Sequence, residues 1–134
     1  MATQLHPWAF GQQEREKEIA GTAASMAFPE LVADLSRVLG KKLIAYIGHV
    51  GSTDMVEGWI NGTDHCSEEA RIRLAWEMTS ILRNADDPKV IQKWFTGLNP
   101  DLADRSAIRV LRDEEPAQAE KMLMNAAHSF AVQG

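Results

Sequence analysis

Three side chains that could bind a metal lie close together in the middle of the sequence, His49, His65 and Cys66. Imidazole and thiolate are the ligands that zinc prefers, but the spacing here differs from that of zinc fingers. Cys66 is the single cysteine of the chain, so there is neither a C-x-x-C pair nor an intramolecular disulfide. We therefore expect no metal and no cofactor.

Carboxylates that could serve acid–base catalysis occur in two runs, Asp86-Asp87 and Asp113-Glu114-Glu115. Each run precedes a proline, Pro88 or Pro116, which suits the first position of a helix. Acidic side chains at that place accept hydrogen bonds from free amides and interact favourably with the helix dipole. The sequence also has no glycine-rich phosphate loop and no Ser/His/Asp arrangement. It predicts a protein that is not an enzyme.

Composition and charge limit the remaining classes of function. The chain has no run of 18 apolar residues, and its first ten residues lack the basic start and apolar segment of a secretion signal. We expect no membrane contact and a cytoplasmic location. The net charge of −5 is spread evenly along the chain. Nucleic-acid binders usually gather Lys and Arg on the docking face, so any DNA contact must come from local arrangement.

Helix signals recur along the chain, whereas strand signals are nearly absent, and we predict an all-α fold. The expected helices cover residues 14–24, 29–39, about 41–48, 53–61, 67–84 and 88–96, a short stretch after Ser106, and a final stretch from Pro116. Three regions follow from this order. They are a partly helical N-terminal arm (1–28), a helix-turn-helix region (29–66), and a long connecting helix that leads into a small helical C-terminal domain (67–134).

Residues 43–62 predict a helix-turn-helix, with Gly51 in the turn and Trp59 facing inward from the second helix. In DNA-binding pairs the start of the second helix meets base edges. The candidate DNA-binding residues are Lys41, Lys42, Ser52, Thr53, Asp54 and Glu57. The two carboxylates repel phosphate and can only accept a hydrogen bond, for instance from a cytosine amine. The alternative is a helix pair retained for packing or dimerisation, without an operator.

Two stretches resemble a family of bacterial antitoxins. Residues 43–62 resemble an Xre-type helix-turn-helix, and residues 90–113 resemble the toxin-binding domain of the MbcA/ParS/Xre antitoxins. The second stretch shares an aromatic-rich helix around Trp94, an Asn-Pro-x-Leu loop at Asn99, and an Arg-Ser pair at Arg105 before a short helix. It departs from the family at Ala107, where proline is usual. The resemblance covers residues 30–131.

The resemblance implies an antitoxin of a type II toxin–antitoxin system. Such a protein binds and neutralises a RES-domain toxin, an enzyme that degrades NAD, by blocking its active site. It also represses its own operon as a homodimer, and residues 67–134 would contain its toxin-binding domain. Two alternatives stay open: a stand-alone transcription regulator whose C-terminal domain serves dimerisation, and an adaptor for another protein.

The Asn99-Pro100 pair has a physical role of its own. Proline pushes the preceding residue out of the helical region, and asparagine can bond its own local backbone, so the pair makes a defined corner. We expect Leu98 and Leu102, on either side of this corner, to pack back between the Trp94 helix and the final helix. The corner is then either a rigid binding edge or a structural bend only.

Arginines near the corner complete the expected toxin-binding surface. We expect Arg105 to pair with Asp101 or Asp104, or to bond carbonyls at a helix end. Arg109 and Arg112 are expected to project outward from the short helix, where arginine suits protein interfaces. The candidate toxin-binding residues are Trp94, Leu98, Asn99, Pro100, Arg105, Arg109 and Arg112.

Overall fold

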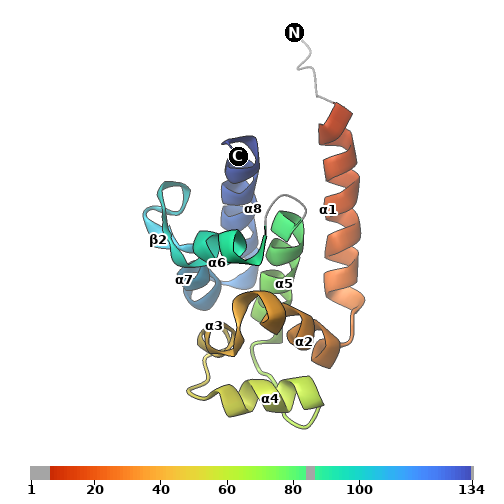
Figure 1. Ribbon diagram of the computed structural model, residues 1–134, viewed down its shortest axis with the longest axis vertical. Helices are drawn as coiled ribbons and strands as arrows, with labels where there is room; N and C mark the ends of the chain where they lie inside the picture. The colour runs from red at the N-terminus through yellow and green to blue at the C-terminus, as the bar shows by residue number, and fades with distance from the viewer. Residues whose placement is uncertain (1–6, 84–86, 134) are drawn as a thin grey trace.

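The computed structural model describes residues 7–83 and 87–133, and over these residues the protein is helical apart from a two-stranded hairpin (Figure 1). The elements in chain order are α1 (Pro7–Ser25), α2 (Phe28–Leu39), α3 (Lys41–Ile47), α4 (Thr53–Asn61), α5 (Glu69–Arg83), α6 (Pro88–Thr96), β1 (Leu98–Asn99), the 3-10 helix η1 (Pro100–Leu102), β2 (Arg105–Ser106), α7 (Ala107–Asp113) and α8 (Pro116–Gln133). The predicted all-α class is confirmed. Residues 1–6 of the expected arm and residues 84–86, with Asp86, lie outside the described residues.

Local capping signals place several helix ends where the sequence predicts them. Ser52 Oγ accepts a hydrogen bond from the Asp54 amide at 3.0 Å, and Asp87 Oδ1 accepts one from the Val90 amide at 3.1 Å. Ser106 Oγ caps α7 in the same way. Gly62 follows the last residue of α4 and caps its end. Its φ of 75° is the left-handed conformation that glycine adopts without strain.

Tertiary contacts decide the elements that the sequence misplaces. α1 begins at Pro7 rather than at Glu14, and it packs along α5 with Ala23 buried between them. Between the helices expected at 88–96 and after Ser106, where the sequence predicts only a corner, the chain forms a hairpin in which Leu98 pairs with Ser106 and Asn99 with Arg105. Strands this short carry no alternating pattern that a sequence could display.

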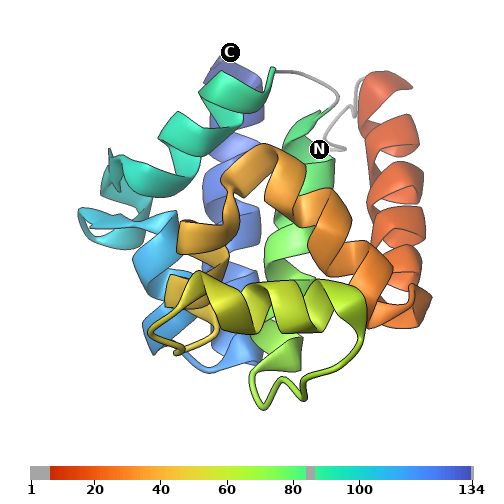
Figure 2. The same cartoon turned by 60° about the horizontal axis from the view of Figure 1, so that its bottom comes forward.

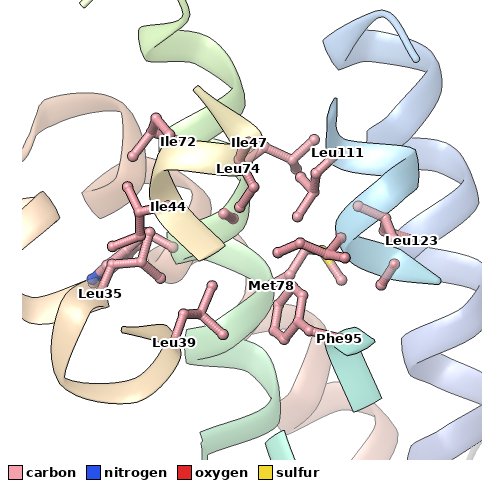
Figure 3. Close-up of a cluster of buried hydrophobic side chains, with 14 of the residues drawn as sticks. Leu35, Leu39, Ile44, Ile47, Ile72, Leu74, Met78, Phe95, Leu111 and Leu123 are labelled. Atoms are coloured by element: carbon pink, nitrogen blue, oxygen red, sulfur yellow. The ribbon is translucent and has the colours of Figure 1, made fainter. Parts of the chain in front are cut away.

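α5 lies at the centre of the molecule, with α1 on one side of it and α8 on the other (Figures 1 and 2). α2, α3 and α4 pack together at one end, and this end comes forward in Figure 2. One continuous cluster of buried side chains joins both halves of the chain. Figure 3 shows Met78 of α5 between Ile44 of α3 and Leu123 of α8. Within the described residues, no helix combines the length and apolar character that crossing a bilayer requires.

Polar side chains from neighbouring helices bond the carbonyl groups at five helix ends. Arg73 of α5 donates from Nη1 to the Ala23 and Met26 oxygens at the end of α1, at 2.9 and 2.7 Å. Four further side chains do the same elsewhere: Arg71 at the end of α7, Arg15 at the end of α5, Arg112 at the end of α3 and Gln92 at the end of α2. The last carbonyls of a helix have no partner within it, so these bonds both satisfy the ends and hold the helices together.

Replacing Arg73 by methionine tests this arrangement, because methionine keeps the apolar stem and removes the guanidinium. We expect Arg73→Met to lower the free energy of unfolding by about 2–3 kcal/mol, since two carbonyl groups lose a charged donor. The measurement is urea unfolding followed by circular dichroism. The matched control is Arg37→Met, because the Arg37 side chain is 77% exposed. It should change stability by no more than about 0.5 kcal/mol, and equal effects of the two substitutions would contradict the role of Arg73.

Candidate functional site

A hollow of about 310 Å³ lies between α6, the hairpin corner and α8. Its lining residues are Trp94, Leu98, Asn99, Pro100, Asp101, Ala126 and Phe130. The first four of these belong to the predicted toxin-binding set. The structure therefore gathers the apolar and corner members of that set at one place on the surface.

The two leucines beside the corner have opposite environments. Leu102 is 1% exposed and packs with η1 against α8, as expected, whereas Leu98 is 77% exposed. The expectation that Leu98 packs inward is wrong. Successive side chains of a strand point to opposite faces, and in β1 the Asn99 side chain is half-buried while that of Leu98 is exposed. Leu98 is consequently a large apolar side chain presented to solvent.

Hydrogen bonds hold the corner in shape. Asn99 Oδ1 accepts from the Asp101 amide at 2.9 Å, and the Asn99 carbonyl accepts from the Asp104 amide at 3.0 Å. Ala103 and Asp104 both adopt positive φ, 57° and 61°, which reverses the chain into β2. The expected corner, in which Asn99 bonds its local backbone before Pro100, is confirmed. The backbone that carries the exposed Leu98 is therefore held by hydrogen bonds.

Trp94 forms the inner wall of the hollow with an unused donor. Its side chain is buried, and its ring meets Phe95 edge-on, with centroids 5.1 Å apart. The indole Nε1 has no hydrogen-bond partner among the described residues. A buried donor left without an acceptor costs about 1–3 kcal/mol.

The three predicted arginines lie outside the hollow. Arg105 Nη1 lies 3.5 Å from Glu114 Oε1, so its expected pairing with Asp101 or Asp104 is wrong; the hairpin brings it beside the α7–α8 connection instead. Arg112 does not project outward as expected. It donates to the Tyr46 carbonyl at 2.6 Å, and its guanidinium lies 4.5 Å from the Tyr46 ring centroid. Arg109 is exposed as expected, beside Asp113 on the next turn.

The candidate DNA-binding residues fall into two groups. Lys41 forms an ion pair with Glu57, which joins α3 to α4 and offsets both charges. Lys42, Ser52 and Thr53 line a second hollow of about 530 Å³ at the start of α4. Asp54 is exposed at the same helix end.

Two residues that the sequence analysis did not assign to DNA binding, Tyr46 and Arg112, also line this second hollow. Arg112 comes from α7, far away in the sequence, and no local pattern could place it there. Gly48 allows α3 and α4 to approach, because a Cβ at this position would lie 2.6 Å from the Trp59 ring.

The residues first considered for metal binding have structural contacts. His49 Nε2 bonds the Arg112 carbonyl at 2.8 Å, and the His65 carbonyl accepts from Trp59 Nε1. Cys66 is buried, and burial is the main cause that raises the pKa of its thiol. In residues 7–83 and 87–133, no three His, Cys, Asp or Glu side chains are grouped so that they could hold a metal ion.

Among the described carboxylates, Glu77 has the most perturbed environment, and no sequence pattern singles it out. It lies on α5 with 6% of its surface exposed, and its Oε2 has no hydrogen-bond partner among the described residues. Burial, and then the charges of Glu120 and Glu16, raise the pKa of Glu77 to about 7. Because the neighbouring charges come from α8 and α1, only the tertiary structure reveals this site.

Comparisons of this chain with protein-family models, with curated proteins and with solved structures find no match. The resemblance of residues 43–62 and 90–113 to antitoxins stays an expectation drawn from those residues. The geometry of the two hollows therefore carries the functional argument.

The raised pKa of Glu77 makes stability depend on pH. The folded state binds this proton more tightly than the unfolded state, so stability falls as pH rises from about 4.5 to about 7. Glu77→Gln removes this dependence. We expect the free energy of unfolding of the variant, relative to the parent chain, to rise by roughly 2–3 kcal/mol between pH 4.5 and pH 8.

Urea unfolding at both pH values measures this difference. Glu14→Gln, at an exposed position of α1, is the control and should follow the parent chain at both pH values. A constant difference between Glu77→Gln and the parent chain would contradict the assignment.

Proposed function

We propose that the chain is a cytoplasmic antitoxin that binds and neutralises a RES-domain, NAD-degrading toxin through the hollow between α6 and α8. The observation that carries the proposal is the exposure of Leu98 on a corner fixed by hydrogen bonds. An exposed apolar side chain beside a partly apolar hollow gives a partner protein apolar surface to bury. The resemblance of residues 90–113 to toxin-binding domains supports the choice of partner.

Each part of the hollow has a role in such a complex. Leu98 inserts into an apolar pocket of the toxin, while an apolar side chain of the toxin enters the hollow beside Phe130. Trp94 supplies the apolar inner wall of the hollow. The corner at Asn99-Pro100 is already fixed, so little conformational entropy is lost on binding. The chain acts by occupying the toxin surface, and the catalysis belongs to the toxin.

The arginines are assigned smaller roles. Arg109 has an exposed side chain and serves at the rim of the interface, where charged residues influence association more than affinity. Arg105 and Arg112 are already bonded within the chain, to Glu114 and to Tyr46. Neither lines the hollow at Leu98, and both are assigned a structural role.

Leu98→Asp tests the toxin-binding surface. The toxin to be used is the protein encoded beside this gene, co-expressed with the variant. We expect the variant to lose protection against the toxin and to bind it at least about 30-fold more weakly, because a central apolar anchor becomes charged. Its folding stability should stay within about 0.5 kcal/mol of the parent chain, because the side chain is exposed.

The matched control is Thr22→Asp, which places the same charge on an exposed position of α1. It should protect as the parent chain does. Full protection by Leu98→Asp, with toxin retained in a pull-down, would reject the proposed surface.

We further propose that α3 and α4 act as a helix-turn-helix that binds operator DNA as a homodimer and represses the operon. Lys42, Ser52 and Thr53 gather at the start of α4 and supply a charge and two hydroxyl donors for phosphate. The amides at this helix end are favourable for an anion as well. The Lys41–Glu57 pair leaves Lys42 as the stronger phosphate contact.

A pair of lysine substitutions tests DNA binding. Lys42→Gln should weaken binding to the chain's own upstream DNA and reduce the slope of log affinity against log salt by about one. Lys41→Gln should leave that slope nearly unchanged, because its charge is already offset by Glu57. Gel shifts at several salt concentrations measure both. Equal slopes for the two variants, or no sequence-specific binding, would contradict the proposal.

The same cluster at the start of α4 also favours a second candidate, a stand-alone transcription regulator whose C-terminal domain serves dimerisation. In that case Leu98 would contact a second copy of the chain. Sedimentation of Leu98→Asp separates the two candidates. The regulator predicts that this variant becomes monomeric and loses operator binding, whereas the antitoxin predicts that its loss is confined to the toxin.

A further inference from the structure

A groove of about 350 Å³ is lined by residues of α1, α5 and α8. α5 forms the floor with Ala70 and Glu77, while α1 and α8 form the walls with Ala24 and Ala117. α1 and α8 meet beyond one end of the groove, where His128 Nε2 lies 3.0 Å from Glu16 Oε1. The groove is therefore a gap between two helices that a third helix supports from below.

The walls of the groove suit a helix as the occupant. Half of the lining residues are alanines, and the side chains of Ala24 and Ala117 are exposed. Small side chains on both walls let another helix come close enough to place its own larger side chains between them. Helix-in-groove docking is a common mode of peptide recognition and uses an apolar face of the ligand helix.

The negative charge of the groove indicates which side chain the apolar face of the docking helix must carry. Glu77 is 6% exposed, lines the groove, and has an Oε2 without a hydrogen-bond partner among the described residues. Glu120 on α8 and Glu16 on α1 add negative charge around it. Burying a carboxylate without a partner is costly, so a cation is the complement that this groove requires.

The hydrogen-bond donors of the side chains near Glu77 are already in use. Arg73, the basic residue on the groove lining, bonds Glu69 and the carbonyls that end α1. His128 bonds Glu16. A metal ion does not fit, because the lining offers methyl groups where further oxygen ligands would be needed. A lysine or arginine side chain fits better, because its apolar stem can contact the alanines of the walls while its cation pairs with Glu77 on the floor.

We propose that this groove is a docking site for an amphipathic helix of a partner protein, and that a lysine or arginine within the apolar face of that helix pairs with Glu77. The site involves α1, which lies outside the stretch that resembles antitoxins, and it is separate from the hollow at Leu98. The proposal thus goes beyond the proposed function and does not depend on it.

The test uses two synthetic helical peptides of about 18 residues, long enough to form a helix. Both have a leucine and alanine face and a glutamine face. One carries a lysine in the middle of the apolar face, and the other carries norleucine there. Titrations of the 15N-labelled full chain are followed by amide chemical shifts. We expect the lysine peptide to shift residues of the groove and to bind at least about tenfold more tightly than the norleucine peptide.

Variants of the chain assign the effect to Glu77. Glu77→Gln should abolish the preference for lysine, because the amide keeps the size of the side chain and removes its charge. Glu14→Gln, outside the groove, should retain the preference. Ala117→Trp should block both peptides by filling the gap. Leu98→Asp should bind the lysine peptide as the parent chain does, which separates failure here from failure of the toxin site.

Several results would overturn the proposal. One is equal affinity for the two peptides, and another is a set of shifted residues away from the groove. n-Butylammonium that binds as tightly as the lysine peptide would make this a site for free amines. Sedimentation showing a dimer that Ala117→Trp dissociates would make a second copy of the chain the occupant.

Discussion

The structure depends on one constraint: the carbonyl groups at helix ends need hydrogen-bond donors from elsewhere in the protein. A bundle of short helices has many such ends, and each one buried without a donor would cost free energy. Here the donors come from neighbouring helices: Arg73, Arg71, Arg15, Arg112 and Gln92 reach the ends of α1, α7, α5, α3 and α2. Each bond satisfies one helix and fixes the position of another, so the same side chains provide capping and tertiary structure.

This use of arginine influences which surfaces remain for partners. Arg71 and Arg73 lie at the start of α5, close in sequence to the helix pair, yet both point to carbonyl groups of the protein itself. Lys41 is held by Glu57. The positive charge left at the start of α4 is small, which fits a chain of net charge −5. In our proposal, protein binding is therefore the main function, and operator binding depends on Lys42 and on pairing of two copies.

The strained backbone of the corner between β1 and β2 keeps an apolar side chain exposed on the surface. Ala103 and Asp104 adopt left-handed conformations that cost about 1 kcal/mol or more each for residues other than glycine. Burial of Leu102 against α8 and the bonds of Asn99 offset this cost. The result is a loop that cannot collapse onto the core, and Leu98 stays exposed on it.

The sequence by itself determined the helices and most of their ends, because caps such as Ser52, Asp87 and Ser106 act on amides two or three residues away. It also marked the corner at Asn99, whose bonds are equally local. The tertiary structure alone decided that Leu98 is exposed while Leu102 is buried, and that Arg112 faces α3. It also decided that Glu77 is buried among charges from two other helices. These outcomes depend on contacts between segments far apart in the chain, and no local spacing encodes such contacts.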